Sequence, residues 1–85
     1  MFIHIGGDVV ISSAEVVSIN DLHTTSSDAT KEFLEVAKEE GFIRDISNGN
    51  PKSFIITSKH VYLSPISSLT IKKRANFLKS LSEEN

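Results

Sequence analysis

Short apolar runs separated by turn residues recur along this chain, a pattern typical of a sheet built from short strands. The run Phe54-Ile55-Ile56 is the clearest, because it joins aromatic and β-branched side chains and is too short for a helix. Asn48-Gly49-Asn50-Pro51 precedes it and supplies turn residues. Thr57-Ser58-Lys59 is short enough to return the chain as a hairpin, so a second strand is expected over residues 60–64, with Val61 and Leu63 on one face.

The same pattern predicts four more strands. They are expected at Phe2–Ile5, Val9–Ile11, Val16–Ile19 and Phe42–Ile46, the last being a candidate for the edge of the sheet. Gly6-Gly7-Asp8 is expected to form a turn between the first two strands. Ser12–Glu15 is expected to be a turn or a bulge, and residues 20–28 are polar and predict a loop.

Two stretches carry helical periodicity. The first helix is expected from Asp28, as its N-cap, to about Glu40, with Gly41 ending it. Its apolar stripe consists of Ala29, Phe33, Leu34, Val36 and Ala37. The second is expected over about residues 68–82, capped by Ser67 or Ser68. One side of this second helix carries Ile71, Arg74, Ala75, Phe77, Leu78 and Leu81.

These elements predict an α+β fold, with a small, mostly antiparallel sheet of five to six short strands and two helices against it. One domain is expected to span residues 1–85. A domain of this size buries only about 60% of its unfolded surface, so association between copies is expected to stabilise it. The terminal helix either packs on its own sheet or reaches a neighbouring copy. Ile71, Phe77 and Leu81 are its candidate residues for an oligomer interface.

The formal charge of −2 conceals an uneven distribution. Residues 1–46 contain nine acidic residues against Lys31, Lys38 and Arg44, whereas residues 47–85 contain six basic residues against two glutamates. Such asymmetry favours an anionic partner or head-to-tail association. The ordinary alternative is solvated surface charge.

Metal and redox chemistry lack their usual residues here. The chain has no cysteine, which excludes a disulfide framework and a thiolate metal site. His4, His23 and His60 lie far apart and none has a second ligand at helical spacing, so no metal site is expected. Gly6-Gly7 lacks the glycine spacing of a dinucleotide-binding or phosphate-binding loop.

Neither a Gly-x-Ser-x-Gly turn nor a cysteine nucleophile is present. We therefore expect no catalytic residue, no enzyme, no cofactor and no small-molecule substrate; an enzyme would need a pocket of convergent polar groups. The apolar runs are at most three residues long, so no membrane insertion and no signal peptide are expected. The expected location is cytoplasmic.

The feature that best indicates a function is a group of basic residues. Lys72-Lys73-Arg74 and Lys79 lie on the terminal helix, Lys52 follows the turn at Pro51, and Lys59 lies at the hairpin tip. Basic side chains that neutralise phosphates give sequence-independent affinity that falls with salt. The candidate nucleic-acid-binding residues are therefore Lys52, Lys72, Lys73, Arg74 and Lys79. The alternatives are a solvated face for the lysines and a structural ion pair for Arg74.

Segments along nearly the whole chain resemble the RemA/RemB family of extracellular matrix regulators. They are Phe2–Gly6, Gly41–Asn50, Pro51–Thr57 and Tyr62–Ala75. The Asn-Gly-x-Pro-Lys-Ser turn at Asn48–Ser53 and the Lys-Lys-Arg-Ala run make the RemB branch the more similar one. No single motif is diagnostic, and the specificity lies in the ordered series.

The resemblance implies a cytoplasmic regulator that promotes biofilm-matrix gene expression in Gram-positive bacteria. The RemA branch binds DNA and assembles into rings, with arginines at the turn equivalent to residues 48–52 and another basic residue early in the chain. Here that turn carries Asn50, Pro51 and Lys52, and the early position is Glu15. If DNA is bound, the cluster on the terminal helix is therefore the expected contact.

Two hypotheses follow. The first is a homo-oligomeric transcriptional regulator that binds double-stranded DNA through its basic surface. The second is a regulator that acts through protein contacts without binding DNA itself, which the acidic first half of the chain and the missing arginines favour.

Overall fold

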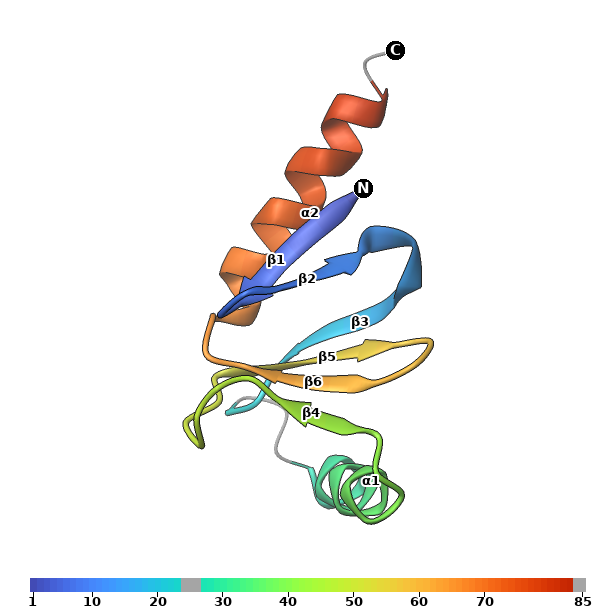
Figure 1. The fold of residues 1–85 in the computed structure, drawn as a ribbon, viewed down its shortest axis with the longest axis vertical. Coiled ribbons are helices and arrows are strands. Elements are labelled where there is room, and N and C mark those ends of the chain that lie inside the picture. Colours follow the sequence, from blue (N-terminus) through green and yellow to red (C-terminus); the bar gives the residue numbers. More distant parts are fainter. Residues whose placement is uncertain (24–26, 84–85) are drawn as a thin grey trace.

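The computed structural model describes residues 1–23 and 27–83, with side chains described as far as residue 76 (Figure 1). Its strands are β1 (Phe2–Gly6), β2 (Val9–Ser12), β3 (Val16–Asp21), β4 (Ile43–Asp45), β5 (Ser53–Thr57) and β6 (Val61–Ser64). Its helices are α1 (Asp28–Glu39) and α2 (Ser68–Glu83), and the 3-10 turn η1 (Ser13–Glu15) lies between β2 and β3. The expected α+β class is confirmed, and η1 occupies the segment predicted as a turn or bulge.

The strands form two sheets, one of β1 and β2 and one in the order β3-β5-β6-β4. All pairings are antiparallel except that of β4 with β6, so the larger sheet is mixed. The expectation of a mostly antiparallel arrangement is confirmed, and the β4–β6 pairing is its parallel exception. The chain reverses between β4 and β5, and β5 and β6 form an antiparallel hairpin, so β4 must run parallel to β6 when it takes the free edge of that strand.

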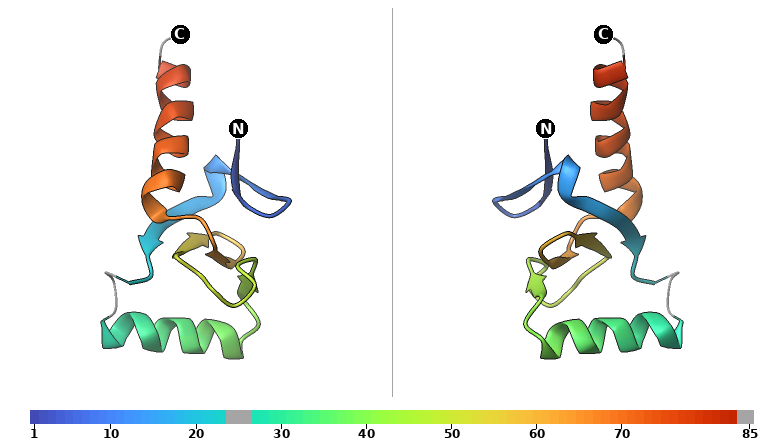
Figure 2. Two further views of the ribbon diagram at one scale, coloured as in Figure 1. Left: turned by 90° about the vertical axis from the view of Figure 1, so that its left-hand side faces the viewer. Right: turned by 90° about the vertical axis from the view of Figure 1, so that its right-hand side faces the viewer.

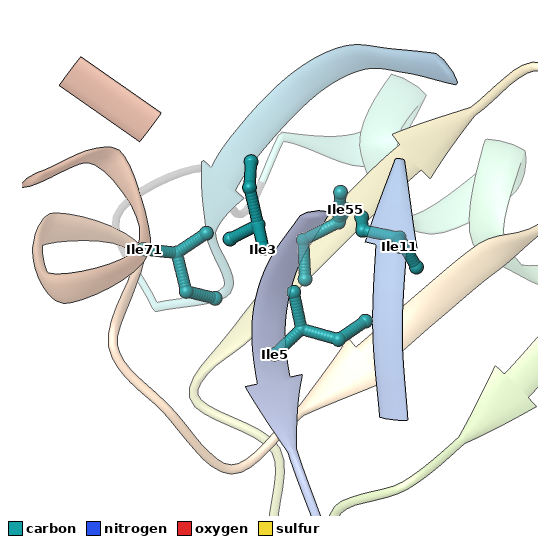
Figure 3. Packing of buried hydrophobic residues seen from close by; sticks show 5 residues of the cluster. All are labelled: Ile3, Ile5, Ile11, Ile55 and Ile71. Carbon is teal, nitrogen blue, oxygen red and sulfur yellow. The ribbon is translucent and has the colours of Figure 1, made fainter. Parts of the chain in front are cut away.

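The larger sheet is covered on both faces (Figure 2). On one face, Ile55 of β5 packs against the β1–β2 hairpin and α2. Figure 3 shows the five buried isoleucines of this cluster, which are Ile3, Ile5, Ile11, Ile55 and Ile71. Strand alternation explains why residue 55 points to this side while its neighbours point to the other.

The opposite face carries a smaller cluster under α1. Phe54 and Val61 from the sheet contact Ala37, with Leu34 packed beside them. The N-cap lies one residue earlier than expected: the Ser27 hydroxyl, not the Asp28 carboxylate, accepts a hydrogen bond from the Thr30 amide at 3.1 Å, and α1 begins at Asp28. A serine hydroxyl at that position satisfies an otherwise unpaired amide of the first turn.

Helix α2 begins with a similar cap. The Ser67 hydroxyl accepts a hydrogen bond from the Thr70 amide at 3.2 Å. Of the two predicted caps, Ser67 and Ser68, Ser67 is therefore the N-cap. Ile71 points into the core, and the helix runs beside β1 and away from the four-stranded sheet (Figure 1). The C-terminal half of α2 therefore extends away from α1, at the opposite end of the molecule.

Candidate nucleic-acid interface

The outward side of α2 presents two adjacent lysines. Lys72 and Lys73 are exposed, and neither makes an ion pair with any residue that the structure describes. Their position follows from the helical period, because Ile71 and Ala75 face the core and place residues 72 and 73 on the solvent side. An unpaired ammonium group on a regular helix is available to an external anion such as a phosphate.

Arg74 has a different role from its two neighbours. Its Nη1 group donates a hydrogen bond to the main-chain carbonyl of His4 at 2.8 Å, which ties α2 to β1. The side chain is exposed, and the guanidinium carries further N–H groups beyond this one. The alternative of a structural role for Arg74 is therefore realised as a main-chain contact rather than as an ion pair.

The backbone of Lys52 is bonded to the end of β6, the strand that precedes α2 in the chain. The Lys52 amide donates to the carbonyl of Ser64 at 2.8 Å, and Ser64 lies shortly before the first residue of α2. The side chain of Lys52 is exposed. The backbone of this lysine is therefore fixed while its charge stays in solvent.

The turn before Lys52 is braced by Asp45. The Asp45 carboxylate accepts hydrogen bonds from the Ser47 hydroxyl at 2.5 Å and the Ser47 amide at 2.8 Å. These two bonds lower the pKa of the Asp45 carboxyl group below its usual value, and the bond from the hydroxyl has the larger effect. A bond from the Asn50 amide to the Ser47 carbonyl at 3.3 Å closes the turn.

Lys59 lies apart from the other basic residues. It follows the far end of β5, whose five residues span roughly 17 Å, whereas Lys52 precedes the near end. The ammonium group of Lys59 pairs with the carboxylate of Glu15 at 3.3 Å. Glu15, the acid at the position where the resemblance implies a basic residue, is thus engaged within the protomer.

The remaining predicted residues have mixed outcomes. Phe77, Lys79 and Leu81 belong to α2 by their backbone, but their side chains lie outside the described residues. Ile71, expected at an interface between copies, is fully buried in the core of its own protomer. Its place on the helical face that packs against β1 and β3 leaves it no surface for a neighbour, so that expectation for Ile71 is wrong.

Sequence reasoning missed an apolar groove beside α1. Phe33, Val36 and Phe42 are exposed, and together with Ala37, Ile56 and Val61 they line a cavity of about 330 Å³ between α1 and the β5–β6 hairpin. The helical period assigns Phe33 and Val36 to the buried stripe of the helix. This apolar face of α1 is wider than the part of the sheet that the helix covers. The width of that face is the one signal in the sequence that could have indicated the groove.

The histidine and acidic side chains of the described residues do not converge on a metal centre. Among these residues, no group of three or more histidine, aspartate or glutamate side chains is arranged to hold a metal ion. The ring of His4 is hydrogen-bonded to the carbonyl of Gly7 at 2.7 Å, and the rings of His60 and Tyr62 form a T-shaped pair with centroids 6.0 Å apart. Over the same part of the chain, neither helix combines the length and the hydropathy needed to cross a membrane.

Two comparisons with known proteins place the chain among relatives. A family described as RemA-like, extracellular matrix regulatory protein A-like, matches residues 2–75. Extracellular matrix regulatory protein B of Bacillus subtilis (strain 168) is 41% identical over 78 residues, which cover 92% of this chain and 94% of that protein. The family match spans both sheets and the first half of α2.

Proposed function

Because the chain belongs to the RemA-like family of extracellular matrix regulatory proteins, we propose that it regulates extracellular matrix genes as a homo-oligomer that binds double-stranded DNA through a basic surface. The surface consists of Lys52, Lys72, Lys73 and Lys79, with a smaller contribution from the free N–H groups of Arg74. No step of this proposal requires catalysis or a cofactor.

The observation that carries the proposal is the pair of exposed lysines on α2. Lys72 and Lys73 have no carboxylate partner among the described residues, whereas Lys59 is paired with Glu15. Lysine contacts to phosphates displace condensed counterions and supply affinity without reading bases. The binding we propose is therefore governed by DNA shape and charge more than by sequence.

Association between copies strengthens this mode of binding. One protomer offers only a few phosphate contacts, so its affinity at physiological salt would be low. Several copies bound to the same duplex add their contacts, because after the first contact each further one is intramolecular. A homo-oligomer thus turns a small cluster of charges into a useful DNA-binding surface.

A mobility shift with a promoter-length duplex across a salt series tests the proposal. We expect the double variant Lys72→Gln/Lys73→Gln to lose affinity for DNA, by the same factor for every DNA sequence. The slope of log affinity against log salt should fall by roughly 0.9 for each phosphate that is no longer neutralised. The matched control is Lys31→Gln/Lys38→Gln, which removes the same charge from α1. Absence of binding by the unmodified chain at low salt contradicts the proposal.

The alternative is a regulator that acts through protein contacts without touching DNA. The apolar groove beside α1 favours it, since exposed apolar patches mark interaction surfaces. Charge reversal at Lys72 and Lys73 separates the two. Under the alternative, matrix-gene expression in cells is unchanged by the reversal, whereas under the main proposal it falls together with DNA affinity.

A further inference from the structure

The connection between β4 and β5 holds the one asparagine of this chain that is followed by a glycine. Asn48 and Gly49 are both exposed, and the connection extends beyond the ends of its strands, as Figure 1 shows. The backbone angle φ is +57° at Asn48 and +83° at Gly49, so both residues lie in the left-handed region. The same connection carries Lys52, one of the proposed DNA contacts, so a change of charge at Asn48 acts on that surface.

An Asn-Gly pair contains both reactants of a covalent change. The main-chain nitrogen of Gly49, once deprotonated, attacks the side-chain carbonyl carbon of Asn48, and the side-chain nitrogen leaves as ammonia. A cyclic imide results. Water then opens the imide at either of its carbonyl groups and leaves aspartate or isoaspartate. The balance is one water consumed and one ammonia released, and neither an oxidant nor a cofactor is needed.

The structure leaves both reacting groups of this pair accessible. No described residue accepts a hydrogen bond from the Gly49 amide or bonds to the Asn48 side chain. Gly49 has no Cβ to hinder the attack, and no heavy atom lies within 4 Å of the place where one would be. The bond that closes the turn, from the Asn50 amide to the Ser47 carbonyl, is long at 3.3 Å. The local opening that ring closure requires therefore costs little free energy.

The other asparagines of the described residues lack this combination. Asn50 precedes Pro51, whose nitrogen carries no hydrogen and cannot close the imide. Asn20 lies in β3, and its side-chain nitrogen donates to the Ser18 hydroxyl at 2.9 Å. Asn76 lies within α2, where the main-chain amides are committed to helical hydrogen bonds. The reaction is therefore expected at Asn48 first.

We propose that Asn48 is a site of spontaneous deamidation and that the carboxylate formed there weakens the binding of DNA. The reaction depends on the turn alone, whereas its effect on DNA rests on the proposed function. Lys52 is the one charged residue of the connection, residues 46–52, so the new carboxylate changes its net charge from +1 to zero. Each modified protomer then loses about one phosphate contact. Because the modified fraction rises with the age of the protein, DNA binding declines with age.

Peptide mapping by mass spectrometry tests the reaction. The purified chain is incubated at neutral and at mildly alkaline pH, and its asparagines are compared at successive times. Conversion should be fastest at Asn48 and should accelerate with pH, because the attacking nitrogen must be deprotonated. Protein-isoaspartate methyltransferase should label residue 48, since opening of the imide gives isoaspartate and direct hydrolysis of the amide does not. An Asn48 that stays unchanged or reacts no faster than Asn20 overturns the inference, as does a product without isoaspartate.

Three variants test the effect of the new charge on DNA. Asn48→Asp carries the charge of the product in every copy, and aspartate, like asparagine, tolerates the left-handed region. In the mobility shift, its slope of log affinity against log salt should be shallower by about 0.9 per bound protomer. Ser58→Asp is the control, because it adds the same charge beyond the far end of β5 and should keep the slope. Asn48→Gly has no side-chain amide and suits a positive φ, so its DNA binding should not decline on incubation.

The failures of this inference and of the proposed function are distinguishable. A chain that is modified at Asn48 but shifts no DNA even when fresh contradicts the function and the effect on DNA, while the reaction stands. An unreactive Asn48 in a chain that binds DNA overturns the inference and leaves the function in place. Asn48→Asp with the slope and affinity of the unmodified chain overturns the effect on DNA. So does an equal decline on incubation for Asn48→Gly and the unmodified chain, because another change is then responsible.

Discussion

The hydroxyl group of Ser64 donates a hydrogen bond to the main-chain carbonyl of Ile5 at 2.5 Å, joining β6 to β1 through the core. The same oxygen accepts a bond from the Ile66 amide at 3.0 Å. Both Ser64 and Ile5 are fully buried. This one side chain therefore satisfies two main-chain groups and attaches the hairpin to the four-stranded sheet.

Removing that hydroxyl should destabilise the fold. For Ser64→Ala we expect the free energy of unfolding to fall by about 1–3 kcal/mol, because a buried carbonyl and an amide lose their partner. Urea unfolding followed by circular dichroism measures it. Ser58→Ala, at an exposed turn position, is the control and should change stability little. Equal losses for the two variants would show that the buried bonds contribute nothing.

Arg74 should matter to stability more than to DNA affinity. Arg74→Gln removes the bond to the His4 carbonyl and should lower the free energy of unfolding by about 0.5–1.5 kcal/mol. Its effect on DNA affinity should be smaller than that of Lys72→Gln, whose side chain is free for phosphates. Thermal unfolding and the mobility shift are measured on both variants. A larger loss of DNA affinity for Arg74→Gln, with stability unchanged, would reverse the roles assigned here.

Asp45 should give the fold a stability component that depends on acid pH. Its pKa is lowered in the folded state by the two bonds from Ser47, so the stabilisation is complete above the pKa of the unfolded chain. It is lost as the pH falls from about 4 through the lowered folded pKa. Thermal unfolding between neutral pH and about pH 2 should show Asp45→Asn less stable near neutrality, with the difference shrinking in acid. A constant difference across that range refutes the assignment.

Two adjacent glycines should respond differently to alanine. At Gly6, φ is +131° and an added Cβ would lie 2.8 Å from Cδ of Pro65, so backbone strain and a steric clash combine. At Gly7, φ is +55° and no heavy atom lies within 4 Å of the added carbon. Gly7→Ala should cost about 1–2 kcal/mol, the penalty of the left-handed region, and Gly6→Ala clearly more. Chemical unfolding of both variants ranks them, and equal losses would mean that Pro65 moves aside.

Local patterns in the sequence were sufficient to locate every described strand and both helices. Alternation along β6 predicted that Val61 and Leu63 share a face, and both pack in the cluster under α1. The helical period of α2 placed Arg74 on the inner side and Lys72 on the outer side. Ser67 was one of two predicted caps and is the one used. These features depend on interactions within a few residues of each other, so the order of residue types determines them.

Contacts between distant segments depend on which surfaces meet, and only the tertiary structure decided them. In the tertiary structure β4 lies parallel to β6, and Glu15 pairs with Lys59. Arg74 donates to the His4 carbonyl instead of pairing with an acidic side chain. The tertiary structure also left Phe33 and Val36 outside the core. The helical spacing of apolar residues in the sequence predicts which face of a helix is apolar, but the width of the opposing sheet determines how much of that face is buried. The groove beside α1 exists because the helix has more apolar surface than the sheet beneath it can cover.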